Sequence, residues 1–157
     1  MIMKRKSIII MLIAIIIPGC SEKDDQNIEK LILEKEKKIL DEWGKGHTMI
    51  FPMNSADEIT YFEPGTEKRI DGKNNFTDFL KPYENTFIVD KYEMLNPKVQ
   101  VHGDIAVLSY NLVDYSKNEN NVEQITQWNS TEVYKKIDGD WKIIHSHWSY
   151  TKPTIKP

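Results

Sequence analysis

Apolar residues near the start of the chain recur at helical spacing. Between Ile28 and Trp43, the apolar residues at positions 28, 31, 32, 39, 40 and 43 recur close to the 3.6-residue period of an amphipathic helix. Gly44 and Gly46 follow, and glycine ends helices because it adopts left-handed backbone angles without steric cost. The pattern therefore predicts a helix over residues 28–43.

A second helix is predicted after a mixed segment. Residues 47–73 contain a strand candidate at 58–62 and then a turn through Pro64-Gly65. Asn74 or Asn75 can cap a following helix, because asparagine side chains accept hydrogen bonds from free backbone N–H groups. The apolar residues of this helix share one face, which holds Phe76, Phe79, Leu80 and Tyr83.

The second half of the chain has the composition of β-strands, rich in Val, Ile, Thr and aromatic residues. Tight reversals at 102–104, at 117–121 and at Asp138-Gly139 separate the candidates. Long consecutive strands joined in this way predict an antiparallel meander, and with the helices gathered near the N-terminus the expected fold class is α+β. The predicted strands are residues 86–95, 98–102, 105–115, 122–137 and 141–150.

The first twenty residues have the pattern of a targeting segment. A basic stretch, Lys4-Arg5-Lys6, precedes an apolar run at 7–17 that is too short to span a bilayer. The run ends in Gly19-Cys20, which resembles the bacterial lipobox, so we expect residues 1–19 to be a lipoprotein signal peptide and Cys20 to be lipidated. An acidic tether at 20–27 would follow. The expected location is the bacterial cell envelope, on the periplasmic or surface face.

Length, charge and cysteine content narrow the choice of function. A chain of 157 residues has room for one compact domain. Its net charge of −3 becomes −6 without residues 1–19, which hold three basic residues and no acidic ones, so nucleic acid is not an expected partner. Membrane attachment would rest on the lipid anchor alone. The single cysteine excludes an internal disulfide and a Cys₂ or Cys₄ zinc site.

Several segments together resemble a known family. They are Thr60-Tyr61-Phe62-Glu63-Pro64, Ile70-Asp71-Gly72, residues 96–106, Thr131-Glu132-Val133-Tyr134 and, most specifically, Asp138-Gly139-Asp140-Trp141-Lys142-Ile143-Ile144-His145-Ser146-His147-Trp148-Ser149. In order and spacing they resemble the association domain of calcium/calmodulin-dependent protein kinase II and its bacterial SnoaL-like relatives, in the nuclear transport factor 2-like superfamily.

This resemblance implies a cystatin-like cone, a strongly curved antiparallel β-sheet wrapped around the N-terminal helices, with a pocket opening into the cone. Residues 28–151 would form the cone domain and 152–157 a C-terminal tail. Family members often dimerise through the outer sheet face, so a homodimer is expected. In the kinase association domain, pocket arginines bind small carboxylates, and three of their positions fall here on Asn111, Glu132 and Trp148. None is basic, so binding of an anion in that manner is not expected.

Strand alternation provides candidate pocket residues. Along residues 122–137 it places Thr126, Trp128, Ser130, Glu132 and Tyr134 on one face, a mixture of aromatic and sparse polar groups typical of small-molecule pockets. Glu132 is the sharpest catalytic candidate, because a carboxylate among aromatics has a raised pKa and can exchange protons near neutrality. The alternative is a glutamate on a partly wet strand that pairs with a lysine. With the resemblance, the predicted ligand pocket comprises Tyr61, Asn111, Trp128, Glu132 and Trp148.

His145 and His147 lie two residues apart on one strand, a spacing that could hold a metal or supply a general acid or base. No third ligand is evident nearby, so no metal and no cofactor are expected. If Trp148 lines the pocket, Ile144 and Ser146 share its face and both histidines point to the opposite one. A bulge near Ser146 would reverse that assignment.

Three hypotheses of function remain open. The first is an anchored extracytoplasmic domain that binds a small, largely apolar ligand in its cone. The second is a cofactor-free lyase, isomerase or cyclase that uses Glu132, His145 or His147 as general acid or base. The third is a purely structural association module, whose cone would be filled by its own side chains.

Overall fold

The computed structural model describes residues 22–118 and 120–152. The predicted signal peptide and Cys20 lie outside these residues. In the described part of the chain, no helix combines the length and the apolar character needed to cross a membrane. In chain order the elements are α1 (Glu22–Gly44), α2 (Ile50–Met53), β1 (Ser55–Phe62), β2 (Ile70–Asp71), α3 (Lys73–Leu80), the 3₁₀ turn η1 (Lys81–Tyr83), β3 (Val89–His102), β4 (Ile105–Lys117), β5 (Glu123–Ile137) and β6 (Asp140–Tyr150).

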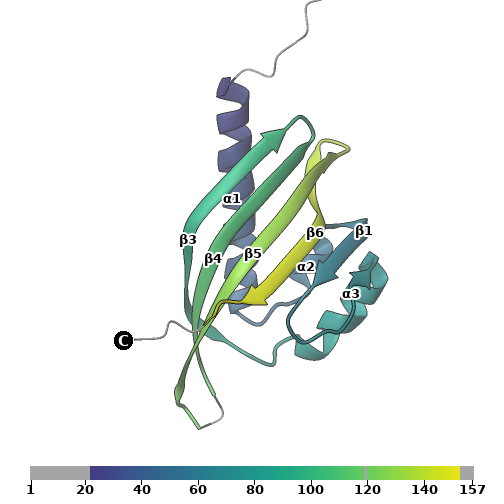
Figure 1. Ribbon diagram of the computed structural model, residues 1–157. Helices are drawn as coiled ribbons and strands as arrows, with labels where there is room; N and C mark the ends of the chain where they lie inside the picture. The colour runs from purple at the N-terminus through teal and green to yellow at the C-terminus, as the bar shows by residue number, and fades with distance from the viewer. Residues whose placement is uncertain (1–21, 119, 153–157) are drawn as a thin grey trace, which may run out of the picture.

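The strands form one curved, unclosed sheet in the order β2-β1-β6-β5-β4-β3, with α1 packed along one face (Figure 1). β3 to β6 are an antiparallel meander, as the turn signals predict. β1 departs from this pattern, because it pairs in parallel with β6 and brings the early part of the chain beside its end. The α+β class and the curved sheet around an N-terminal helix are confirmed.

α1 begins at Glu22, six residues before the predicted start at Ile28. Asp24 and Asp25 fall in its first turn, where negative side chains are favoured by the helix dipole. The described part of the expected tether is therefore helical. The face of α1 toward the sheet buries the apolar residues Ile32, Ile39 and Leu40.

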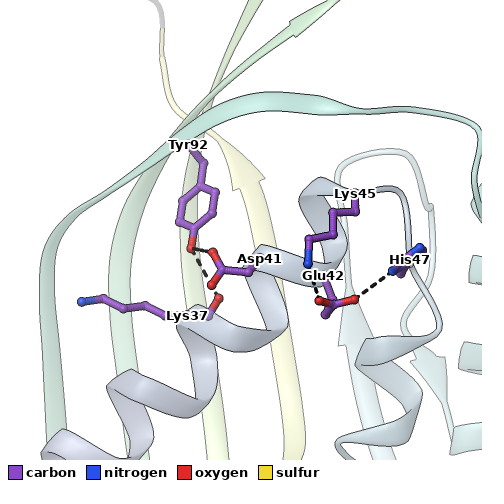
Figure 2. Close-up of polar contacts among 6 residues, drawn as sticks. All are labelled: Lys37, Asp41, Glu42, Lys45, His47 and Tyr92. Atoms are coloured by element: carbon purple, nitrogen blue, oxygen red, sulfur yellow. Dashed lines mark hydrogen bonds and ion pairs between the residues drawn. The ribbon is translucent and has the colours of Figure 1, made fainter.

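Polar contacts fix the end of α1 against β3 and the following loop (Figure 2). The Tyr92 hydroxyl donates to Asp41 Oδ1 at 2.6 Å and to the Lys37 carbonyl at 3.4 Å. Glu42 accepts from Lys45 Nζ at 2.6 Å and lies 2.9 Å from His47 Nδ1. These contacts hold the end of α1 in place, and Trp43 in this segment lies on the concave side of the sheet.

Two short elements and one cap differ from the sequence predictions. α2 and β2 have too few residues to show a period, and the pattern missed both. α3 forms where predicted, but its N-cap is Gly72 at φ +84°, with no capping side chain. Neither Asn74 nor Asn75 is the cap, and Asn75 Nδ2 instead donates to the Asp71 carbonyl at 2.8 Å.

The two strands predicted at 86–95 and 98–102 form one strand, β3, with an irregular register between Leu95 and Lys98. Proline at 97 cannot donate to a strand partner, and Asn96 has a positive φ of 50°. The pattern detected this local break but not that the strand continues past it.

A bulge at Ile144 decides which residues of β6 face the core. Val133 pairs with His145 while the next residue, Tyr134, pairs with Ile143, so Ile144 is the extra residue. Ile143 therefore takes the buried position in the first half of β6, and Ser146 and Trp148 take it in the second. The expectation that Ile144 shares the face of Trp148 is wrong, because the bulge shifts the alternation by one.

Candidate ligand pocket

A cavity of about 500 Å³ opens between the concave face of the sheet and the helices. Ten of its eighteen lining residues are aromatic, and we call it the aromatic pocket. Its lining comprises Trp43, Thr48, Phe51, Tyr61, Glu63, Gly65, Phe76, Phe79, Leu80, Tyr83, Phe87, Val89, Asp114, Ser116, Thr126, Trp128, Trp148 and Tyr150.

Both walls of the aromatic pocket follow from residue periodicity. On the sheet side, alternate residues of β4, β5 and β6 point inward, because successive side chains of a strand point to opposite faces. On the helix side, the predicted apolar face of α3 and η1 closes the opposite wall. The sheet wall comprises Asp114, Ser116, Thr126, Trp128, Trp148 and Tyr150, and the helical wall comprises Phe76, Phe79, Leu80 and Tyr83.

The aromatic rings brace one another. Trp128 lies edge to face with Trp148 at 5.8 Å between ring centroids, and its other neighbour is Tyr150 at 4.6 Å. Across the pocket, Tyr61 packs on Phe76 at 4.7 Å. Such pairs fix ring orientation, because the positive edge of one ring is attracted to the negative face of the next. Burial also raises the pKa of Tyr61, so its hydroxyl stays protonated.

Asp114 is a pocket carboxyl that the sequence analysis did not single out. It is only 5% exposed, and its Oδ2 accepts a hydrogen bond from Trp128 Nε1 at 2.6 Å. Burial raises the pKa of Asp114, and the Trp128 hydrogen bond partly opposes that rise. The signal was present in β4, where the buried alternation 106, 108, 110, 112 ends on an aspartate.

Glu132 is completely buried and does not line the pocket. Its Oε1 accepts hydrogen bonds from Ser146 Oγ at 2.8 Å, from Trp148 Nε1 at 3.0 Å and from Ser130 Oγ at 3.4 Å. Trp148 thus lies between this carboxyl and the cavity. Within the described residues, no lysine pairs with Glu132 and its Oε2 has no hydrogen-bond partner.

Glu36 on α1 is a second fully buried carboxyl, and with Glu132 it forms what we call the buried carboxylate pair. It accepts hydrogen bonds from the hydroxyls of Tyr110, at 2.6 Å, and Tyr134. Burial raises the pKa of both carboxyls. The charge of Glu36 raises the pKa of Glu132 further, and hydrogen bonds lower both values in part. Glu132 is therefore the member that keeps its proton as the pH rises.

The remaining predicted site residues lie on the convex face. Asn111 does not line the pocket, because the alternation of β4 turns it outward, where its Nδ2 donates to Asn129 Oδ1 at 2.8 Å. This corrects its assignment as a pocket residue. Of the predicted pocket set, Tyr61, Trp128 and Trp148 line the cavity.

His145 and His147 also face away from the pocket, beside Phe62 of the neighbouring strand. The His145 Nδ1 lies 2.7 Å from Thr60 Oγ1, and the Phe62 ring lies 5.8 Å from that of His147. Burial lowers the pKa of His145, with smaller contributions from His147 and Arg69. Among residues 22–118 and 120–152, no three metal-ligating side chains group together.

The comparisons with known proteins agree with the fold described above. A family model described as a SnoaL-like domain matches residues 47–153. A candidate ketosteroid isomerase from Parabacteroides distasonis ATCC 8503 shares 34% sequence identity and a TM-score of 0.71, over 85% of this chain and 95% of that chain. None of the curated proteins matches the sequence.

More distant structures show the same fold. The association domain of the C. elegans kinase CaMKII is 22% identical, with a TM-score of 0.68 over 82% of this chain and 99% of that one. A nuclear transport factor 2-like protein from Salmonella enterica serovar Typhimurium is 20% identical, with a TM-score of 0.67 over 83% of this chain and 95% of that chain. The resemblance seen in the sequence is confirmed.

Proposed function

Since the chain belongs to the SnoaL-like domain family, we propose that it binds a small, largely apolar ligand in the aromatic pocket. One observation carries this proposal: the cone holds an open cavity of about 500 Å³ that its own side chains do not fill. Ligand sites are commonly concave and apolar, with a few polar groups that orient the ligand. The open cavity favours ligand binding over a purely structural module.

Native mass spectrometry of the protein purified from its host tests this proposal. We expect a bound small molecule that is lost on denaturation. Thr126→Trp, which fills the pocket from β5, should remove the bound mass. Gln127→Trp adds the same ring on the convex face and should retain it. Equal ligand occupancy in both variants would contradict binding in this cavity.

A second candidate function is cofactor-free acid–base catalysis, supported by Asp114. It is a carboxyl in the pocket wall whose pKa is raised toward neutrality, as a general base requires. The reaction class is proton transfer next to a carbonyl, in line with the description of the Parabacteroides protein. Glu132 is sealed behind Trp148, and the histidines face away, so Asp114 is the better-placed base.

The test is isomerisation of a β,γ-unsaturated ketone, followed by the ultraviolet absorbance of the conjugated product. Asp114→Asn should abolish turnover, and Glu132→Gln should retain it. If the wild-type protein binds the ketone without turnover, isomerisation of this substrate is excluded. Ligand binding in the aromatic pocket would then stand without catalysis.

We further propose that the protein is a homodimer formed through the convex sheet face. Phe62 is 40% exposed there, beside His145 and His147. Phe62→Lys should shift the mass measured by light scattering from dimer to monomer. Met53→Lys, a change at a 68% exposed residue on α2, should not. A dimer that survives Phe62→Lys would contradict this interface.

Attachment to the cell envelope through a lipid on Cys20 completes the proposal. It is supported by the basic stretch, the short apolar run and the Gly-Cys ending. Labelling with a palmitate analogue should be lost in Cys20→Ala. Unchanged labelling of that variant would contradict the anchor.

A further inference from the structure

The charge of the aromatic pocket restricts the ligand further. No lysine, arginine or histidine is among its eighteen lining residues, whereas Glu63 and Asp114 both are. The ion pairs found in the described residues include neither of these two carboxylates. The pocket therefore holds negative charge that no protein cation found in the described residues balances.

Asp114 is the carboxylate that a ligand would meet. It is 95% removed from solvent, and its single hydrogen bond, from Trp128, reaches Oδ2 and leaves Oδ1 available. A charged carboxylate in such a place is costly unless a counter-charge accompanies it. A positively charged group on the ligand would provide that counter-charge.

The aromatic rings around Asp114 also favour a positively charged ligand. The Trp128 indole is oriented by its hydrogen bond to Asp114, and Trp148 and Tyr150 pack against it. Ring faces carry negative potential and attract cations, most strongly in tryptophan. Carboxylate and rings together form the donor set that recognises organic ammonium ions. The same set repels carboxylate ligands.

We propose that the ligand is an organic cation, an amine or quaternary ammonium group on an apolar body, with its nitrogen beside Asp114 and Trp128. This inference rests on the ligand-binding function proposed above and adds the chemical class of the ligand. The apolar body fills the part of the pocket between α3 and the sheet, where Phe76, Phe79 and Leu80 form the wall.

Three probes of similar shape and different charge test the inference. They are 2-phenylethyltrimethylammonium, its uncharged carbon isostere 3,3-dimethylbutylbenzene, and the anion 4-phenylbutyrate. Tryptophan fluorescence of the full chain reports binding, because Trp43, Trp128 and Trp148 all line the pocket. We expect the cation to bind at least about tenfold more tightly than the isostere. The anion should bind most weakly.

Asp114→Asn removes the charge and keeps an oxygen to accept the Trp128 hydrogen bond. Its affinity for the cation should fall at least about tenfold, while its affinity for the uncharged isostere stays within about twofold of wild type. Asp104→Asn removes the same charge at the exposed β3–β4 turn and is the control. It should leave both affinities unchanged.

The outcomes separate the two proposals. If the isostere or the anion binds as tightly as the cation, the inferred charge is wrong and the ligand-binding function stands. Selectivity that survives Asp114→Asn also overturns the inference. If none of the three probes binds, the ligand-binding function is contradicted, and the inference with it.

Discussion

The concave face of the sheet holds two clusters of carboxyls and aromatic rings with opposite properties. In the buried carboxylate pair, the hydrogens of Tyr110, Tyr134, Ser146 and Trp148 are all directed at carboxyl oxygens, and neither carboxyl lines the aromatic pocket. In the aromatic pocket, Asp114 has one partner and open space in front of it. The same residue types thus make a structural core in one place and the lining of an open pocket in the other. Unfilled volume makes the difference.

The largest effect is expected from removing Glu36 from the buried carboxylate pair. Glu36→Ala leaves the hydroxyls of Tyr110 and Tyr134 buried without an acceptor and opens a cavity, which costs about 4 kcal/mol of unfolding free energy. Urea denaturation measures this loss. Glu36→Gln keeps an acceptor oxygen and should cost less than half as much. Equal losses would show that the hydroxyls do not depend on this acceptor.

A pair of matched substitutions compares the packing of the two clusters directly. Ser130 and Thr126 both point inward from β5. Ser130 is buried beside the buried carboxylate pair, whereas Thr126 lines the aromatic pocket. Ser130→Leu overpacks its site and should cost about 3 kcal/mol, whereas Thr126→Leu should stay within about 1 kcal/mol of wild type. Thermal and urea unfolding of the two variants measure the difference. Similar losses would mean that the pocket is not free volume.

The pH dependence of the unfolding free energy reports the protonation of Glu132 in the buried carboxylate pair. Glu132 has a pKa well above its ordinary value of 4.5, so the folded protein holds this proton more tightly than the unfolded chain. Stability from this group is complete below pH 4.5 and is lost as the pH rises toward the folded pKa, by up to about 1.4 kcal/mol per pH unit. Glu132→Gln should flatten the decline in stability above pH 4.5.

Comparison of the wild-type protein with Glu132→Gln removes the contribution of groups that do not interact with Glu132. His145 has a lowered pKa and acts in the opposite direction near pH 6.5, equally in both. Carboxyls with lowered pKa, such as Asp140, change their contribution below pH 4.5. Urea denaturation at each pH gives the unfolding free energy, and its slope against pH is compared between wild type and Glu132→Gln. Identical slopes would show that Glu132 is ionised in the folded protein throughout.

The smallest effect is expected at the surface contact of α1 with β3. Tyr92→Phe removes the hydrogen bond to Asp41 but leaves the ring in place (Figure 2). Water can replace the lost hydroxyl at the exposed Asp41 carboxylate, so the cost is about 0.5–1 kcal/mol, measured as a shift in Tm. A loss as large as that of Glu36→Ala would contradict the distinction between buried and exposed polar contacts.

Local patterns predicted most of the fold. Periodicity identified α1, α3 and the meander, because an amphipathic helix and an alternating strand carry their own spacing. It missed α2 and β2, which are too short to show a period, and it placed the start of α1 six residues late. The parallel pairing of β1 with β6 joins distant parts of the chain, and no local signal reports it.

The candidate site was predicted less completely. Alternation placed Trp128 and Glu132 on the inner face, but it did not tell which of them meets open space. That depends on Trp148, which seals Glu132, and on Glu36, which comes from a helix almost a hundred residues earlier. Alternation in β4 also places Asp114 on the inner face, but the pattern does not tell that the cavity begins at this end of the strand.

The bulge at Ile144 has a consequence for comparing this chain with its relatives. One additional residue puts the two halves of β6 out of phase, so Ile143 and Trp148 are both inward although five positions separate them. A relative without that residue would place aligned side chains of one half on the opposite face. Gaps in an alignment of β6 therefore belong at Ile144, and a gap placed elsewhere would equate pocket residues with residues of the convex face.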